Sequence, residues 1–116
     1  LLIHEMSTKD NLINNEYKKN VVKYSEKYKK DIVGLITQKN DISNNDLLYL
    51  TPGVNININK DKIDQQYRTP DDAIIRDNCD IIIVGRGIYD SNEPEKTAEI
   101  YKFLAWNAYQ LKIKNR

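Results

Sequence analysis

Cysteine and histidine are almost absent from this chain of 116 residues, which has one of each, Cys79 and His4. A single cysteine cannot form an internal disulfide, and one histidine without further nitrogen or sulfur ligands does not make a zinc site. We therefore expect no bound metal. Cys79 stands just before an apolar run, where a small, inert and buried residue is expected.

The chain also lacks an excess of charge of one sign, and it has no long apolar run. The 18 basic and 17 acidic residues leave a formal net charge of +1. They are mixed along the chain, so neither nucleic acid nor an anionic membrane is expected as a main partner. No apolar run approaches the roughly 20 residues of a membrane span, and no basic-then-apolar signal segment opens the chain. The expected location is cytoplasmic.

What is present is an alternation of strand-like and helix-like segments. Strands are expected at residues 1–6, 31–37, 47–51 and 81–84, and helices at residues 16–28, 70–76 and from 94 onward. The first helix has an apolar face made of Tyr17, Val21, Tyr24 and Tyr28. A polar connection, residues 38–45, follows the second strand. Strands that alternate with helices indicate an α/β fold with a parallel sheet and right-handed crossovers.

Four such units amount to half of a (β/α)₈ TIM barrel, whose usual length is about 250 residues. An open half-barrel has two unpaired strand edges and an uncovered apolar face, which soluble proteins avoid. The chain also begins within a strand and without an initiator methionine. We therefore expect residues 1–116 to be a partial barrel domain that the N-terminal half of the same barrel completes, on the same or on a second polypeptide.

The most informative stretch is Asp-Ile-Ile-Ile-Val-Gly-Arg-Gly at residues 80–87. Its β-branched residues predict a strand that is buried on both faces. Gly85 and Gly87 would let the backbone approach a ligand, and Arg86 carries a planar fork of donors suited to a phosphate. Ligands bind at the carboxyl ends of parallel strands, so the stretch predicts an anion site. The alternative is a tight turn with a solvated arginine.

Three further strings accompany this stretch: Glu-Met-Ser at residues 5–7, Thr-Pro-Gly-Val at 51–54 and Gln-Gln-Tyr-Arg-Thr at 65–69. In this order and at these separations, the four strings resemble the C-terminal half of orotidine 5′-phosphate decarboxylases. The resemblance is greatest to the eukaryotic form, which in many organisms is one domain of UMP synthase, and it extends to about residue 111. It implies that the chain supplies strands five to eight of a TIM barrel.

The resemblance also implies an activity and partners. The reaction would be the cofactor-free conversion of orotidine 5′-phosphate into UMP and CO₂, carried out by a homodimer. Arg86 would bind the 5′-phosphate, with the backbone amides of Gly85 and Arg86 beside it. Ser7 would bind the polar edge of the pyrimidine. The alternative is that it caps a helix or a turn.

A lid is implied for the polar stretch that begins at Pro52 and runs through residues 53–65. Such a long stretch without periodicity exceeds an ordinary connection, and a lid of this kind excludes water from the ligand. The resemblance implies that Gln65 and Tyr67 reach the phosphate from it. Without the resemblance, Gln65 is interpreted as a solvated loop residue and Tyr67 as a packing residue.

Some positions depart from the family pattern, and others are expected to have a structural role. His4 stands where alanine is common, and Asp10 and Asp64 stand where glycine is common. Asp64 could repel a phosphate or strain the lid. Glu5 is expected to form a structural salt bridge, and Trp106 is expected to pack within the last helix.

The largest departure is an absent motif. The family carries an Asp-x-Lys-x-x-Asp array in the earlier half of the barrel, where the lysine protonates the carbon that loses CO₂. The nearest string here, residues 61–64, lies in the polar lid and is interpreted as a solvated charge cluster. No catalytic residue is therefore expected in this chain. A noncatalytic phosphate-binding half-barrel, or a related barrel enzyme acting on another phosphorylated sugar, remains an alternative.

Overall fold

The computed structural model describes residues 1–42, 44–57 and 68–116. At its centre lies a sheet of four parallel strands, in the order β1 (Leu2–Ile3), β2 (Gly34–Ile36), β3 (Leu48–Thr51) and β4 (Ile81–Ile82). The predicted parallel sheet is confirmed. Each strand is shorter than its predicted segment, although backbone hydrogen bonds extend the pairing beyond the strands, as from Thr37 N–H to the Leu50 carbonyl.

The helices are α1 (Asn15–Lys27), a short π-helix η1 (Asp72–Arg76), α2 (Arg86–Tyr89) and α3 (Pro94–Lys114). The three predicted helices are confirmed, and α2 was not predicted. α1 begins where the Asn14 side chain accepts a hydrogen bond from the Tyr17 N–H at 2.9 Å, as an N-cap residue does. The described part of the connection from β2 to β3 contains no helix, so the regular alternation of strand and helix fails there. None of the described helices could span a membrane.

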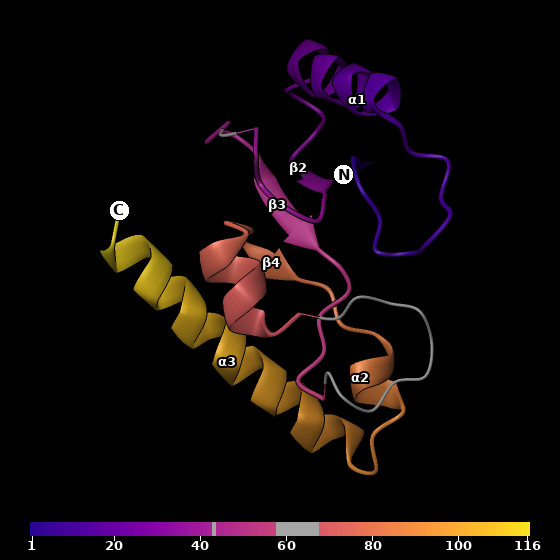
Figure 1. Cartoon of the computed structure of the whole chain (residues 1–116). Coiled ribbons are helices and arrows are strands. Elements are labelled where there is room, and N and C mark those ends of the chain that lie inside the picture. The colour runs from indigo at the N-terminus through magenta and orange to yellow at the C-terminus, as the bar shows by residue number, and fades with distance from the viewer. Residues whose placement is uncertain (43, 58–67) are drawn as a thin grey trace.

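The helices pack against one face of the sheet. Figure 1 shows α1 beside β2 at one end, and η1 and α3 beside β4 at the other. Two apolar clusters fill these junctions. The first consists of Val21, Leu35, Leu47, Tyr49 and Cys79. The second, called here the α3 cluster, consists of Val54, Ala73 and Tyr101, with Ile56, Ile82, Val84 and Ile88 packed against it.

The other face of the sheet is uncovered. Successive strand residues point to opposite faces, and the residues that point away from the helices are exposed, among them Ile3, Leu48, Ile81 and Ile83. Ile81 is 43% exposed and Ile83 37%. The prediction that residues 81–84 are buried on both faces is therefore wrong for this chain, because none of the described residues covers their second face.

Two aromatic residues on the helices are largely exposed. Trp106 is 59% exposed and touches Tyr109 in a stacked pair with ring centroids 6.0 Å apart. On α1, Tyr24 is 54% exposed and Val21 is the buried apolar residue of the predicted face. The packing expected for Trp106 is therefore confined, among the described aromatic residues, to its contact with Tyr109.

A charged network at Glu5 attaches α1 to the ends of β1 and β2. One Glu5 oxygen forms an ion pair with Lys18 of α1, and the other accepts hydrogen bonds from the Thr37 hydroxyl and the Gln38 N–H, both at 3.0 Å. Burial alone would raise the pKa of Glu5, but these hydrogen bonds outweigh it and lower the pKa below its usual 4.5. The structural salt bridge expected for Glu5 is confirmed.

A second network holds the end of α3. Lys112 is buried, and its ammonium group donates hydrogen bonds to the carbonyls of Asn78 and Cys79 at 3.0 and 2.7 Å and forms an ion pair with Asp80 at 2.8 Å. The second Asp80 oxygen accepts a hydrogen bond from the Tyr49 N–H at 3.0 Å. All the strong donors and acceptors here are used, as a buried charge requires.

Two departures from the family pattern have a structural explanation. Asp10 has a φ of 58°, a left-handed conformation that glycine adopts without cost and aspartate tolerates. His4 is buried, and its Nδ1 lies 3.1 Å from the Thr37 hydroxyl oxygen. The histidine thus fills space beside the Glu5 network. Burial lowers its pKa.

Replacing Lys112 by methionine should lower the free energy of unfolding by about 3–5 kcal/mol, because it leaves the Asp80 carboxylate buried without its cation. Urea unfolding of the protein that contains this chain, followed by circular dichroism, measures the loss. Lys114→Met changes an exposed lysine two residues further along the same helix and should change stability by less than about 0.5 kcal/mol. Equal effects of the two substitutions would contradict this role for Lys112.

Glu5→Gln should remove a pH-dependent part of the stability. Because folding lowers the pKa of Glu5, the ionised group stabilises the fold above pH 4.5, and this contribution disappears as the pH falls through the lowered value. The variant should be less stable than the wild type by about 1–3 kcal/mol at pH 7, and the two should converge in acid. Unfolding measured from pH 7 to pH 3, with the exposed Glu26→Gln as control, tests this. A difference that stays constant with pH would refute it.

Candidate functional site

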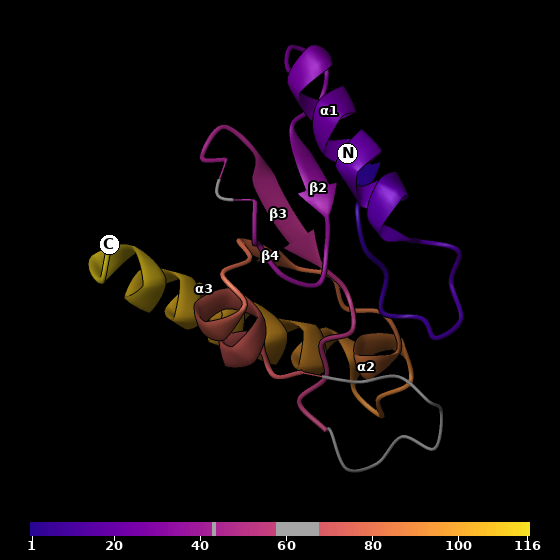
Figure 2. The same ribbon diagram turned by 45° about the horizontal axis from the view of Figure 1, so that its top comes forward.

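The carboxyl ends of the four strands meet at one edge of the sheet, and the predicted binding residues follow these ends. Ser7 comes after β1, Pro52 directly after β3, and Gly85 and Arg86 after β4. In Figure 2 the arrows of β2 and β3 point toward the side of the molecule where α2 lies. The predicted lid residues Gln65 and Tyr67, and the charged string 61–64, lie outside the described residues.

Arg86 is the first residue of α2 and is half-buried. Among the residues that the structure describes, no carboxylate forms an ion pair with its guanidinium. Gly85 precedes it, and a Cβ added at Gly85 would meet only Tyr89, at an ordinary 3.5 Å. Protein packing therefore does not require glycine at position 85. The space beside it, and a guanidinium that pairs with no described carboxylate, suit a phosphate group.

Gly87 has a different reason to lack a side chain. A Cβ there would lie 2.5 Å from the hydroxyl oxygen of Tyr101 and 3.3 Å from a methyl carbon of Val84. The first distance is far inside van der Waals contact, so α2 can pack on α3 only with glycine at this position. The contact with Tyr101 is thus a packing reason for glycine at position 87, and an approach of its backbone to a ligand stays a prediction.

Arg68 is a site residue that the sequence argument missed, although the residue belongs to the Gln-Gln-Tyr-Arg-Thr string. One guanidinium nitrogen donates to the Gln38 carbonyl and to Asp77, both at 2.5 Å, and the other donates to the Thr51 hydroxyl at 2.6 Å and the Pro52 carbonyl at 3.0 Å. These contacts join the carboxyl ends of β2 and β3. The position of Arg68 within the string at residues 65–69 was the signal that could have identified it.

The carboxylate that pairs with Arg68 is held in its charged form. Burial alone would raise the pKa of Asp77, but hydrogen bonds from Arg76 and Arg68 outweigh this effect and lower it. Both partners of the Arg68–Asp77 pair are largely buried, with side chains 13% and 12% exposed. The pair is thus a fixed connection near the ends of β2 and β3, because breaking a buried pair is costly.

The stretch after β3 and the stretch that resumes at Arg68 lie side by side. The Asn55 N–H donates to the Arg68 carbonyl at 2.9 Å, and the Arg68 N–H donates to the Gly53 carbonyl at 3.0 Å. Gly53 has a φ of 74°, which glycine adopts readily. The turn after Pro52 is therefore fixed by its own glycine and by the backbone of Arg68.

Ser7 lies at the carboxyl side of β1 and is half-buried. It does not cap a helix, because α1 begins later and is capped by Asn14. Among the described residues, none forms a hydrogen bond with its hydroxyl, so the group is available to a ligand. A role in binding the pyrimidine stays a prediction.

Cys79 is fully buried, and burial raises the pKa of its thiol to about 11. A thiol with such a pKa is not ionised at neutral pH, so Cys79 is unreactive, and its expected role as an inert buried residue is confirmed. Within the described parts of the chain, no group of three or more His, Cys, Asp or Glu side chains could hold a metal ion.

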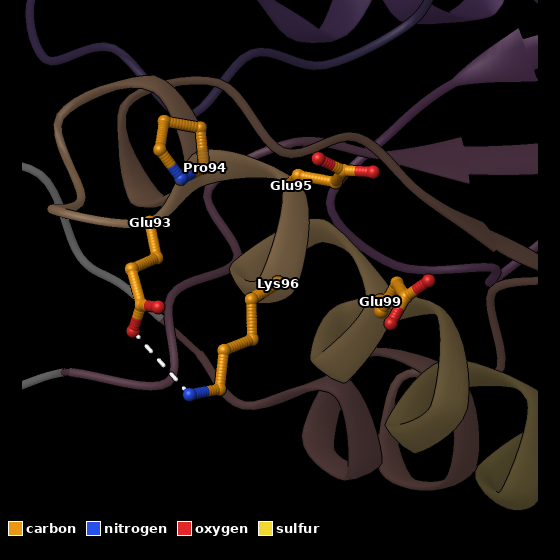
Figure 3. Close-up of a pocket in the computed structure, with 5 residues that line it drawn as sticks. All are labelled: Glu93, Pro94, Glu95, Lys96 and Glu99. Atoms are coloured by element: carbon orange, nitrogen blue, oxygen red, sulfur yellow. Dashed lines mark hydrogen bonds and ion pairs between the residues drawn. The ribbon is translucent and has the colours of Figure 1, made fainter.

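An open hollow lies at the start of α3. Glu93, Pro94, Glu95, Lys96 and Glu99 line it. Figure 3 shows Lys96 paired with Glu93, at 3.3 Å, while Glu95 and Glu99 lie apart from this pair. Three carboxylates and one paired lysine repel an anion, so the hollow does not suit a phosphate.

Comparison with known proteins agrees with the motifs. Residues 1–101 match the family model described as the orotidine 5′-phosphate decarboxylase / HUMPS family. The chain is 38% identical over 117 residues to orotidine 5′-phosphate decarboxylase from Phycomyces blakesleeanus and 37% identical over 123 residues to that from Aspergillus fumigatus. It is 36% identical over 116 residues to uridine 5′-monophosphate synthase from Naegleria gruberi.

The matches cover nearly all of this chain but only part of each relative. The match to the Phycomyces protein covers 98% of this chain and 44% of that protein. The Aspergillus match covers 97% of this chain and 44% of the relative, and the Naegleria match covers 97% of this chain and 23% of the relative. The chain thus spans less than half the length of these relatives. Because the family model matches most of its residues, the chain belongs to the orotidine 5′-phosphate decarboxylase / HUMPS family.

Proposed function

We propose that this chain is the substrate-binding C-terminal half of an orotidine 5′-phosphate decarboxylase. Family membership supports the proposal, and one structural observation carries it: a half-buried arginine without a carboxylate partner among the described residues, at the carboxyl edge of a parallel sheet. Ligands bind at this edge in α/β proteins, and in barrels a phosphate site commonly follows strands seven and eight. Those strands correspond to β3 and β4.

Each binding residue then has a defined task. Arg86 holds the 5′-phosphate with two parallel hydrogen bonds, and the backbone at Gly85 leaves room for the phosphate to approach. Pro52 begins the segment that passes over the phosphate side of the site. Ser7, on the first strand of the sheet, offers a hydroxyl that donates to and accepts from the polar edge of the pyrimidine.

The chemistry itself is assigned to the preceding half of the barrel. The family is a (β/α)₈ barrel, and its Asp-x-Lys-x-x-Asp array lies in that earlier half. The reaction replaces the C–CO₂ bond of orotidine 5′-phosphate by a C–H bond, with the proton donated by the lysine of the array, and gives UMP and CO₂. It needs no cofactor. In this half the protein binds and orients the substrate, which is a large part of any catalyst's effect.

The uncovered surfaces of the sheet support a missing half. β1 and β4 are edge strands, and the apolar hollow between β4 and α3 is lined by residues that include Ile81, Ile82, Ala105 and Trp106. The preceding half would pair with both edges and cover Trp106. We further propose a homodimer in the cytoplasm, as the resemblance implies.

A noncatalytic phosphate-binding half-barrel is the second candidate, because the catalytic array is absent from this sequence. The names of the relatives, which are decarboxylases and a uridine 5′-monophosphate synthase, favour the decarboxylase over an enzyme acting on another phosphorylated sugar.

Arg86→Ala in the complete barrel should weaken UMP binding at least tenfold, since a charge-assisted bidentate contact contributes about 1.5–3 kcal/mol or more. Uridine binding should change little, because the nucleoside has no phosphate. Calorimetry with both ligands measures the two effects. Arg116→Ala removes the same charge at the opposite end of α3, far from α2 in Figure 1, and should affect neither ligand. Equal losses for UMP and uridine would show that Arg86 is structural.

The isolated 116-residue chain should not consume orotidine 5′-phosphate and should self-associate, because it lacks the array and exposes strand edges and an apolar face. Expressed together with the preceding half of its barrel, it should give turnover, followed as loss of substrate absorbance. Turnover by the isolated chain would contradict the assignment of chemistry to the other half. No turnover from the two soluble, associated halves would favour the noncatalytic candidate.

A further inference from the structure

Tyr101 is a buried polar residue between the two segments that form the proposed phosphate site. It lies in the first half of α3, is 2% exposed and belongs to the α3 cluster. Within that cluster, Ile56 comes from the segment after β3, and Ile88 comes from α2. The side chain of Tyr101 therefore lies where the segment after β3 and the segment after β4 meet.

The Tyr101 hydroxyl is hydrogen-bonded to the first of these segments. It accepts a hydrogen bond from the Ile56 N–H at 3.0 Å and donates one to the side-chain oxygen of Asn55 at 3.3 Å. The same Asn55 oxygen accepts the Asn57 N–H at 2.8 Å. Asn55 is buried, so these polar groups have little access to water and depend on one another.

The same hydroxyl oxygen sets the distance to the second segment. It faces Gly87, the residue next to Arg86, and the absence of a Cβ at Gly87 leaves room for the hydroxyl oxygen at this position. One oxygen atom is thus in contact with the segment after Pro52 and with the turn that carries Arg86. Movement of either segment relative to the other would break one of these contacts.

We propose that Tyr101 is a positioning residue for the phosphate site, which sets the placement of Arg86 relative to residues 54–56 through its hydroxyl group. The inference rests on the proposed function, since it gives Tyr101 a task in phosphate binding. A residue that only filled the core would need the ring and not the hydroxyl. The hydrogen bonds and the close approach to Gly87 both involve the hydroxyl oxygen.

The test is Tyr101→Phe in the complete barrel, which keeps the ring and removes the oxygen. UMP binding should weaken about three- to tenfold, the range expected for one net hydrogen bond, while uridine binding stays unchanged. The KM for orotidine 5′-phosphate should rise by a similar factor with a smaller change in kcat. Tyr24→Phe, which removes an exposed hydroxyl on α1, is the matched control and should have no effect.

A second substitution, Gly87→Ala, separates the proposed contact from a general folding defect, because its effect should depend on the Tyr101 hydroxyl. Gly87→Ala places a Cβ 2.5 Å from the Tyr101 oxygen, whereas the next atom of the ring, Cζ, is 3.2 Å away. Removing the oxygen therefore relieves the worst contact. Gly87→Ala should weaken UMP binding more in the wild-type background than in the Tyr101→Phe background, a coupling that a double-mutant cycle measures.

The outcomes separate the two proposals. Unchanged UMP binding in Tyr101→Phe, or equal losses for UMP and uridine, would overturn the positioning role while leaving the proposed function intact. Additive effects of the two substitutions would overturn it as well. If the wild-type barrel bound UMP no better than uridine, the proposed phosphate site itself would be wrong, and the Tyr101 variants would not be needed to show it.

Discussion

A parallel sheet with helices on one face only is the constraint on which the rest of this structure depends. Parallel sheets normally have both faces covered, and here Ile3, Leu48, Ile81 and Ile83 are largely exposed. The chain compensates at its covered face with two apolar clusters and three buried or half-buried charged networks. No described residue covers the second face or pairs with the outer edges of β1 and β4, and the chain spans less than half the length of the relatives it matches.

The charged networks divide between the two ends of the sheet. Lys112 and Asp80 fix the end of α3 near the start of β4, away from the proposed ligand. At the carboxyl edge, Glu5 connects α1 to β1 and β2, and Arg68 connects β2 to β3. Buried ion pairs add little net stability but are costly to break. Their effect is therefore to hold strand ends in one arrangement, and strand ends carry the site.

Much of the fold follows from local patterns in the sequence, and the failures have physical causes. Short apolar runs located the strands. The spacing of apolar residues located the first helix, and prolines at helix starts located the other two that were predicted. The extent of burial at Ile81 and Trp106 was not predictable, because it depends on a partner surface that the pattern assumes. A glycine next to an arginine is equally suited to a ligand and to a neighbouring helix. No local pattern indicated that Gly87 packs against Tyr101, which lies in another element.

The arginines show why the site could be predicted only in part. Arg68, Arg76 and Arg86 look alike in sequence, but Arg68 and Arg76 each pair with Asp77, whereas Arg86 pairs with no described carboxylate. Motif membership pointed to Arg86 and passed over Arg68, whose partners come from three separate segments. A guanidinium already bound to a carboxylate cannot bind a phosphate through the same donors. Among these three arginines, Arg86 is therefore the one whose donors no described carboxylate occupies, whereas Arg68 holds the ends of β2 and β3 together.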